Sequence, residues 1–400
     1  MKIFVLNCGS SSLKYQLYDM TDEIVIASGK VERIGMDDAI LTHEPTGKEE
    51  VKIVTEILEH TTAIEKVFEY LVHPESGVLS DIREIQAVGH RVVHGGEVFS
   101  DSVMVNEQVK AAIKGVFDLA PLHNPANLVG IEAVESVLPG VPNVAVFDTA
   151  FHQTMPKKAF MYPIPKILYK KHKIRRYGFH GTSHKYVSAK AAEFLGKPIE
   201  ELKIVSCHIG NGASITAIDR GKSVDTSMGM TPLEGLMMGT RSGDLDPAII
   251  PFVMGKEDLT LNEVNSMLNK HSGLTGISGY GSDMRDIEEK MVTDEGAKLA
   301  FDMYEYRIRK YIGAYVAAMD GVDVIIFTAG VGENSDILRK AITENLTYLG
   351  IEIDQEINRV RSKKVRRIST SNSKVEVLVV PTNEELMIAR DTLRIVKSNK

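Results

Sequence analysis

The feature that most constrains the fold of this chain is a repeat at roughly half its length. The segment "KIFVLNCGSSSLKYQLYD", which begins at Lys2, is similar to "KIVSCHIGNGASITAIDRG", which begins at Lys203. When Gly9 is aligned with Gly210, each segment is an apolar run, a turn of small residues and a second run that ends near an Asp. Alternating apolar and polar residues after the turn predict a strand, so each segment is expected to be a β-hairpin. Two such hairpins predict two duplicated domains.

The turn of the first hairpin looks like a phosphate-binding loop, but its residues exclude a P-loop. The pattern G-x-x-x-x-G-K-[ST] is absent, because Lys14 follows Leu13 instead of a Gly and Tyr15 stands where Ser or Thr is required. A P-loop also opens a helix, whereas Leu13, Tyr15 and Leu17 alternate with other residues as in a strand. Any phosphate held here is therefore expected to be held by a hairpin.

A second, weaker echo supports the duplication. The apolar runs "VAVFDTA" at 144–150 and "VIIFTAG" at 324–330 follow the two hairpins in the same order, and both break into a turn. Elsewhere, helical periodicity alternates with apolar strands, which predicts an α/β fold with helices on the faces of a parallel or mixed sheet. We expect one domain of residues 1–149 that takes back the C-terminal helix at 383–400, and a second domain of residues 150–382.

Composition limits the class of protein and its partners. Of 400 residues, 25% are charged and 43% hydrophobic, as in soluble globular domains, and the net charge of −7 argues against nucleic acid or anionic membrane as the main partner. Two cysteines, Cys8 and Cys207, make no disulfide framework and fit a reducing cytosol. The first apolar run is too short for a signal peptide, and no segment reaches the roughly 20 apolar residues of a membrane span. A cytoplasmic protein is expected.

Ten motifs in order along the chain carry a family resemblance. They are "NCGSSSLK", "GHRVVHGG", "PLHNPAN", "FDTAFHQTMP", "RYGFHGTSH", "HIGNGAS", "MGMTPLEGLMMGTRSGDLDP", "GSDMRD", "FTAGVGEN" and "PTNEE". Together they resemble the acetate kinase (acetokinase) family from the first strand to the last helix. The resemblance implies two duplicated ribonuclease-H-like domains, of the actin, Hsp70 and sugar-kinase type, with a nucleotide cleft between them. Folds of this type grip phosphate with hairpins, which agrees with the repeat.

The resemblance implies reversible, Mg²⁺-dependent transfer of the γ-phosphoryl group of ATP to acetate, which gives acetyl phosphate and ADP. Because two anions must meet, such a site needs dense positive charge and a metal. Arg91 in "HRVVHGG" and Arg241 in "GTRSGD" end apolar stretches among small residues, where a planar guanidinium can reach carboxylate or phosphate oxygens. The resemblance implies that Arg91 orients the acetate and that both arginines brace the phosphoryl group.

Two histidines are further catalytic candidates. The local sequence alone slightly favours a structural role over a catalytic one for His180 in "YGFHGTSH" and His123 in "PLHNP", as turn or core residues that hydrogen-bond to the backbone. The resemblance implies instead that His180 donates to the phosphoryl oxygens in the transition state, with His123 in support. His184 is expected to be structural.

Asp148, at a strand end in "VFDTAFHQ", invites the role of general base, but the chemistry argues otherwise. Acetic acid has a pKa of about 4 to 5, close to that of Asp and Glu side chains, so acetate arrives deprotonated at neutral pH. Asp148 is therefore expected to be a catalytic residue with an orienting role, or a direct or water-mediated Mg²⁺ ligand. For Mg²⁺, with Mn²⁺ as an alternative, the resemblance selects Asn7 and Glu384, although Glu385 would serve as well.

The resemblance also selects residues for the nucleotide and for the acyl group. The nucleotide, ATP or ADP, is assigned to the two hairpins and to two later segments: Ser10, Ser12, Lys14, His208, Ile209, Gly210, Asn211, Gly212, Asp283, Met284, Arg285, Gly330, Val331, Gly332, Glu333 and Asn334. Backbone N–H groups of the second hairpin can contact the phosphates. A small apolar pocket for the methyl group is assigned, together with Arg91, to Val93, Leu122, Phe179 and Pro232.

Alternatives remain at three levels. An extra methylene in an apolar pocket is worth only about 1 to 3 kcal/mol, so a propionate or butyrate kinase of the same fold is the first alternative. A noncatalytic ATP-binding protein of the Hsp70 or actin type is a remote one, since it would not need both arginines and an apolar pocket. Direct in-line transfer is expected, with a phosphoenzyme on Asp148 or Glu384 as the second choice. The resemblance also implies a homodimer.

Overall fold

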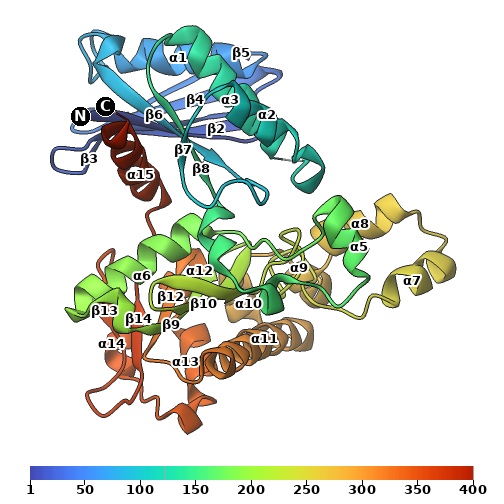
Figure 1. Ribbon diagram of the computed structural model, residues 1–400. Helices are drawn as coiled ribbons and strands as arrows, with labels where there is room; N and C mark the ends of the chain where they lie inside the picture. The colour runs from blue at the N-terminus through green and yellow to red at the C-terminus, as the bar shows by residue number, and fades with distance from the viewer. Residues whose placement is uncertain (122, 400) are drawn as a thin grey trace. The chain divides into compact units, whose positions relative to one another are not determined.

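The computed structural model describes residues 1–121 and 123–399, and the chain divides into two compact units (Figure 1). Unit 1 contains Met1–Gln153 and Asn383–Lys400, and unit 2 contains Thr154–Thr382. The first boundary falls a few residues beyond the expected 149/150, and the second coincides with the expected 382/383. None of the helices in the described ranges combines the length and apolar character that a membrane span needs.

Unit 1 is built on a mixed sheet with strand order β5-β4-β3-β2-β1-β6-β8-β7 in the described residues. β1 pairs antiparallel with β2 and parallel with β6, and β6 pairs parallel with β8. The strands are β1 Lys2–Cys8, β2 Ser12–Asp19, β3 Ile24–Glu32, β4 Met36–Pro45, β5 Val51–Ile57, β6 Ile85–Val92, β7 Val103–Met104 and β8 Asn143–Phe147. The helices are α1 His60–Leu71, α2 Glu107–Lys114, α3 Asn124–Val137 and α15 Glu384–Ser398.

Close approach of the helices to this sheet depends on glycines. In β6, a Cβ on Gly89 would collide with Thr392 and Ile388 of α15. In α3, a Cβ on Gly130 would collide with the thiol of Cys8 in β1. The main apolar core lies on the side of α1 and α3, where Phe4 and Leu6 point from β1. The sheet is therefore covered by α15 on one face and by α1 and α3 on the other (Figure 1).

Unit 2 repeats the central part of this topology. Its sheet has the order β11-β10-β9-β12-β14-β13 in the described residues, with β9–β10 antiparallel and β9–β12–β14 parallel. The strands are β9 Lys203–Ile209, β10 Ala213–Asp219, β11 Lys222–Thr226, β12 Val324–Thr328, β13 Arg366–Arg367 and β14 Glu376–Val379. The helices are α4 Lys157–Phe160, α5 Lys166–His172, α6 Gly181–Leu195, α7 Ile249–Glu257, α8 Leu261–Lys270, α9 Gly273–Ser278, α10 Met284–Lys290, α11 Glu295–Met319, α12 Ala329–Asn334, α13 Asp336–Glu344 and α14 Gln355–Arg359.

The matching order confirms the α/β class and the duplication. Each unit has an antiparallel three-stranded meander followed by two parallel strands, β3-β2-β1-β6-β8 in unit 1 and β11-β10-β9-β12-β14 in unit 2. The two aligned segments form the expected hairpins β1–β2 and β9–β10. In each turn the first glycine donates its N–H to a backbone carbonyl at or next to the start of the second strand, Gly9 to Ser12 (2.7 Å) and Gly210 to Gly212 (3.1 Å), so the second turn closes over one residue fewer.

The second sequence echo is corrected by the topology. It aligns β8 with β12, but β12 lies beside β9 as β6 lies beside β1, so the strand equivalent to β8 is β14. Both β8 and β12 are buried along their whole length. Buried parallel strands are continuous apolar runs with no alternation to distinguish one from another, which explains the mistaken alignment.

A buried histidine makes the stability of unit 1 depend on pH. His90 in β6 is 2% exposed, its Nε2 lies 2.8 Å from Asn143 Oδ1, and burial lowers its pKa from 6.5 to about 4. Between these values the unfolded chain binds a proton that the folded chain does not, so stability falls as the pH falls through this window.

We predict that the unfolding free energy declines by up to about 3 kcal/mol between pH 6.5 and 4 through this group. Urea denaturation of the protein and of His90→Gln at several pH values checks it, because the glutamine cannot be protonated and its decline should be shallower. Equal slopes for the two proteins would contradict the assignment.

Candidate active site

In unit 1, the ends of two neighbouring parallel strands bring Arg91 and Asp148 together. Arg91 is the penultimate residue of β6 and Asp148 directly follows β8, so both side chains lie at the carboxyl edge of the sheet. Arg91 Nη2 is 2.6 Å and Nε 3.0 Å from Asp148 Oδ2, and Nε is also 3.3 Å from Oδ1. Asp148 is only 1% exposed, while Arg91 is 25% exposed. The Arg91 guanidinium therefore binds the Asp148 carboxylate while part of the arginine side chain remains accessible to solvent.

Asn7 and Glu384 complete this cluster. Asn7 is in β1, which neighbours β6, and its Oδ1 lies 3.5 Å from Arg91 Nη1. Glu384 opens α15, where the Asn383 side chain caps the helix by accepting from the Leu386 N–H (2.9 Å). The pKa of Glu384 is raised to about 7, first by burial and then by the nearby Asp148 carboxylate, although Arg91 acts in the opposite direction. Burial and the neighbouring carboxylates thus outweigh the opposing effect of Arg91 on the pKa of Glu384.

A cavity of about 210 Å³ joins these residues to the first hairpin. Lys14 lies opposite Asn7 in the β1–β2 register, and both line the cavity with Arg91 and Glu384. Other lining residues that the sequence did not indicate as site residues are Val5, Tyr15, Gln16, Ser28, Gly29, Lys30, Glu44 and Ile388. Ser10 and Ser12 lie in or beside the hairpin turn and do not line it.

The donor set of this cluster fits Mg²⁺ better than a transition metal. Asn7, Glu384 and Asp148 offer amide and carboxylate oxygens, which suit Mg²⁺. The residues that the structure describes contain no group of three or more His, Cys, Asp or Glu arranged to hold a metal alone. Mg²⁺ usually takes one or two carboxylates together with substrate phosphates, so a sparse set of oxygen ligands is compatible with it.

The turn after β6 is held by asparagines that the sequence analysis missed. The Val93 N–H donates to Asn127 Oδ1 (3.0 Å), and Asn127 Nδ2 donates to the Cys8 carbonyl (2.7 Å). Asn124 accepts from the His94 N–H (3.0 Å) and donates to the His94 carbonyl (2.9 Å). Both are buried in the first turn of α3. The N-x-x-N spacing within "HNPAN" could have indicated that both asparagines lie in one helical turn. His123, which is half-buried, directly precedes this helix.

In unit 2, three histidines form a cluster between α6 and the second hairpin. His180 precedes α6 in the left-handed region (φ 57°), and its ring stacks on His208 of β9 with centroids 4.1 Å apart. The Ser214 hydroxyl lies 2.9 Å from His180 Nδ1 and 2.8 Å from His184 Nε2. His208 Nδ1 is 2.8 Å from the Ser183 hydroxyl. His184 is fully buried, which agrees with a structural role, while His180 lies at the edge of the cluster.

Arg241 lies beside this cluster. A Cβ on Gly212 would lie 3.4 Å from Arg241 Nη1 and 3.7 Å from the His180 ring, so one turn adjoins both side chains. Arg241 Nη1 donates to the Pro232 carbonyl (3.2 Å), and burial lowers the pKa of the guanidinium. Within 1–121 and 123–399, no carboxylate lies at ion-pair distance from it. A partly desolvated cation of this kind favours an anionic ligand.

A larger cavity of about 610 Å³ lies at the hairpin turn of unit 2, and this volume suits a small-molecule ligand. It brings together these residues expected to bind nucleotide: Gly210, Asn211, Asp283, Met284, Arg285, Gly330, Val331 and Asn334. It is also lined by these residues that the sequence analysis missed: Leu274, Ser282, Glu288, Tyr304, Ser335 and Arg361. Two of them could have been predicted from their neighbours in the sequence, because Glu288 follows Arg285 by one helical turn and Ser335 directly follows Asn334.

Several expected ligand residues lie outside this cavity. The Ile209 side chain is buried in the core, and the Gly332 carbonyl accepts from Arg339 Nη1 (2.9 Å). The Glu333 carboxylate accepts from the backbone N–H groups of Ala329 (2.9 Å) and Thr382 (3.0 Å). These contacts indicate that Glu333 fixes the loops around the cavity.

The residues expected to bind the acyl group belong to different units. Val93 lies in unit 1, whereas Phe179 and Pro232 lie in unit 2. Val93 and Phe179 are buried and Pro232 is half-buried. Leu122 lies outside the described residues.

Comparison with known proteins decides the family. The model of the "Acetokinase family" matches residues 2–390. The chain belongs to the acetokinase family. The acetate kinase of Symbiobacterium thermophilum is 59% identical over 399 residues and the whole of both chains. The crystal structure of Porphyromonas gingivalis acetate kinase is 49% identical with a TM-score of 0.95, each chain covered to 99%. A propionate kinase from Francisella tularensis is 42% identical with a TM-score of 0.91, covering 98% of this chain and 99% of its own.

Membership of the acetokinase family confirms the resemblance carried by the ten sequence motifs. The solved structures confirm the expected fold class, because they match nearly the whole chain at well over 25% identity. The individual residue roles stay predictions, which the geometry of each unit makes testable.

The two arginines of this acetokinase-family chain should differ in their effect on stability. Arg91→Ala removes the cation from nearly buried Asp148, so we predict a loss on the order of 3 kcal/mol in unfolding free energy. Arg241→Ala removes a partly buried cation that has no carboxylate beside it in the described residues, so the expected change is below about 1 kcal/mol, in either direction. Urea denaturation monitored by circular dichroism checks both. Equal destabilisation by the two substitutions would be inconsistent with this account.

Proposed function

We propose that this chain catalyses the reversible, Mg²⁺-dependent transfer of the γ-phosphoryl group of ATP to acetate, with acetyl phosphate and ADP as products. The observation that carries the proposal is Arg241, a partly buried guanidinium without a carboxylate partner in the described residues, beside His180 and the hairpin turn at Gly212. The relatives named acetate kinase support the same reaction.

Positive charge and hydrogen-bond donors would stabilise the phosphoryl group during transfer. Arg241 and His180 adjoin the same glycine turn, so both can donate to oxygens of a phosphate held there. Arg91 would orient the carboxylate of acetate and add a second guanidinium. The reaction itself requires a carboxylate oxygen to meet the γ-phosphorus in line with the leaving oxygen of ADP.

No general base is needed for this attack. Acetate is already ionised at neutral pH, and Asp148 is held by Arg91 in an ion pair with Nη2–Oδ2 at 2.6 Å. We propose that Asp148 orients Arg91 and, with Asn7 and Glu384, belongs to the oxygen set that would hold Mg²⁺. The bound ion would supply charge neutralisation on the phosphates. Mn²⁺ is an alternative, because it also accepts oxygen ligands.

Direct transfer to acetate is favoured over a phosphoenzyme. An Asp148 carboxylate that receives three hydrogen bonds from Arg91 is a poor nucleophile, because attack would require at least part of this pairing to be given up. Glu384 is the remaining candidate nucleophile, and its expected role is in metal binding.

A propionate kinase remains the second candidate function, since the matched Francisella tularensis structure carries that name. We propose that Val93 of unit 1 and Phe179 and Pro232 of unit 2 are apolar residues that recognise the acyl group. One additional methylene changes binding by only about 1 to 3 kcal/mol, so propionate should be a poorer substrate than acetate but still a measurable one.

We further propose a cytoplasmic homodimer, as the sequence resemblance implies. The two cysteines are free and buried, which is consistent with a reducing compartment. The negative net charge is consistent with small-molecule substrates as the partners, without nucleic acid.

Trapping the acyl phosphate tests the function. The protein is incubated with MgATP and acetate, propionate or butyrate, and acyl phosphate is converted to hydroxamate with hydroxylamine. We expect most hydroxamate from acetate. Arg241→Ala is the matched control, since it should fold normally while its rate falls by on the order of 10³. The absence of hydroxamate from every acid would overturn the proposal, and a clear preference for propionate would establish the second candidate.

A further inference from the structure

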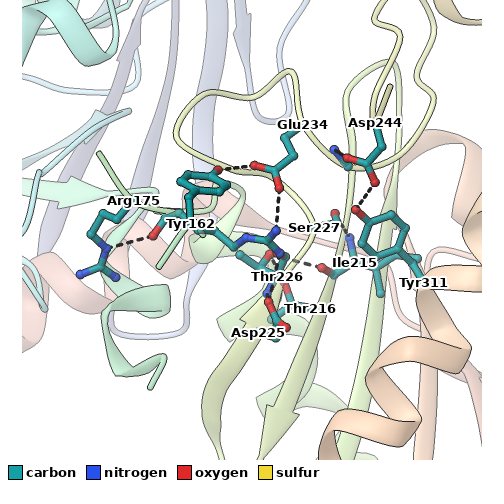
Figure 2. Close-up of polar contacts among 12 residues, drawn as sticks. Tyr162, Arg175, Ile215, Thr216, Asp225, Thr226, Ser227, Glu234, Asp244 and Tyr311 are labelled. Carbon is teal, nitrogen blue, oxygen red and sulfur yellow. Dashed lines mark hydrogen bonds and ion pairs between the residues drawn. The ribbon is translucent and has the colours of Figure 1, made fainter. Parts of the chain in front are cut away.

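Arg176 connects two segments of unit 2 that carry proposed substrate residues, without belonging to the site itself. Figure 2 labels two of the acidic residues to which it is bonded, Asp225 and Glu234. It directly precedes the segment "YGFH" at 177–180, which contains Phe179 and His180. The backbone N–H groups of Tyr177 and Gly178 both donate to the Gly229 carbonyl, at 3.0 and 3.2 Å. The segment is therefore already joined by its backbone to the loop at 228–244.

The Arg176 side chain makes a second connection to the same loop. Nη2 donates to Glu234 Oε1 (2.6 Å), while Nη1 donates to Asp225 Oδ1 (3.1 Å) and to the Thr226 carbonyl (2.5 Å). Asp225 and Thr226 end β11, which is fixed in the sheet. Arg176, Asp225 and Glu234 are 17%, 23% and 28% exposed, so solvent reaches them only in part. The guanidinium thus links strand β11, through Nη1, to the loop at 228–244, through Nη2.

Both carboxylate oxygens of Glu234 accept hydrogen bonds. Its second oxygen accepts from the Tyr162 hydroxyl, and the same hydroxyl accepts from the Met230 N–H (2.9 Å). A Cβ on Gly229 would collide with Glu234 Oε2 and Tyr162, so only glycine leaves room for this carboxylate. We call Arg176, Glu234 and Tyr162 the loop clamp.

The loop held by the clamp carries two proposed substrate residues. Pro232 lies two residues before Glu234, and its carbonyl accepts from Arg241 Nη1 (3.2 Å). The far end of the loop is closed separately, because Asp244 accepts from the Gly235 N–H (2.8 Å) and from the Tyr311 hydroxyl of α11 (2.5 Å). Figure 2 shows Glu234 and Asp244 at these two attachments.

We propose that Arg176 is a positioning residue that, through Glu234, fixes Pro232 and Arg241 relative to Phe179 and His180. The inference rests on the proposed function, since it assigns the clamp to the acyl pocket and to the phosphoryl-binding arginine. The clamp sets how large an acyl group the pocket accepts and how accurately Arg241 meets the phosphoryl oxygens. A displacement of about 1 Å in such a site can cost 10²-fold in rate.

A guanidinium is suited to this task, and an ammonium is not. The planar fork of Arg176 directs Nη1 and Nη2 to different partners at fixed angles, whereas lysine offers one flexible point charge. Arg176→Lys therefore keeps the charge and loses the geometry. Glu234→Gln keeps the shape and an acceptor for Tyr162 and loses the ion pair.

Steady-state kinetics with acetate, propionate and MgATP tests the proposal. For Arg176→Lys and Glu234→Gln we expect kcat/KM for acetate to fall 10- to 100-fold. The preference for acetate over propionate should fall at least threefold, because the pocket wall is no longer fixed. KM for MgATP should change less than twofold, since the larger cavity is lined by other residues. The double variant should lose less than the product of the single losses.

The matched control is Arg309→Lys, which alters another partly exposed ion pair of unit 2, with Glu305 on α11 (Nη2–Oε1 3.4 Å). It should leave the acetate preference unchanged. The proposal is overturned if the clamp variants keep the normal acetate kinetics and preference. It is also overturned if they lose acetate, propionate and MgATP use in equal measure with a lowered melting temperature, because that is a merely structural effect.

Hydrogen exchange gives a readout that does not depend on activity. In Arg176→Lys, the amides of Met230 and Gly235 should exchange faster than in the unmodified protein, while the amides of β9 remain protected. Unchanged exchange across the loop would contradict the clamp even if the protein formed no acyl phosphate. Absence of acyl phosphate in the unmodified protein would instead contradict the proposed function.

Discussion

The ion pair between Arg91 and Asp148 is the interaction on which the unit 1 site depends. It exists because β6 and β8 are parallel neighbours whose carboxyl ends meet, and the asparagines of α3 fix the turn that follows β6. The pair leaves Asp148 nearly inaccessible and Arg91 partly exposed. The position of Asp148 at a strand end suggests a catalytic base, but its carboxylate is paired with Arg91. Asp148 therefore holds the Arg91 guanidinium in place, as the proposed binding of an ionised acid would require.

Unit 2 has the same central sheet topology, but its candidate arginine differs from Arg91 in its electrostatic surroundings. Its guanidinium, Arg241, has no carboxylate at ion-pair distance in the described residues and lies beside stacked histidines and a glycine turn. In both units some candidate site residues come from a hairpin and from the start of a helix: Asn7 and Glu384 in unit 1, and His208 and His180 in unit 2. α15 packs on the unit 1 sheet although it follows the last unit 2 strand, β14, in the chain.

Local patterns in the sequence were sufficient for much of this arrangement. Alternation of apolar and polar residues predicted both hairpins, β1–β2 and β9–β10. The alignment of β8 with β12 failed because buried strands lack a distinguishing period. Asn124, Asn127 and the Arg176–Glu234 pair were missed because their function lies in contacts between distant segments. The local sequence around a single residue, such as a Glu in a loop, does not indicate which arginine will be its ion-pair partner.

In the proposed mechanism acetate attacks phosphorus directly, Asp148 is held by Arg91, and no carboxylate of the protein forms a phosphoenzyme. The most direct test is the stereochemistry of transfer from ATP that is chiral at the γ-phosphorus through oxygen isotopes. One in-line displacement predicts inversion of configuration in the acetyl phosphate. Retention would show two successive displacements, and it would contradict both direct transfer and the supporting role given to Asp148.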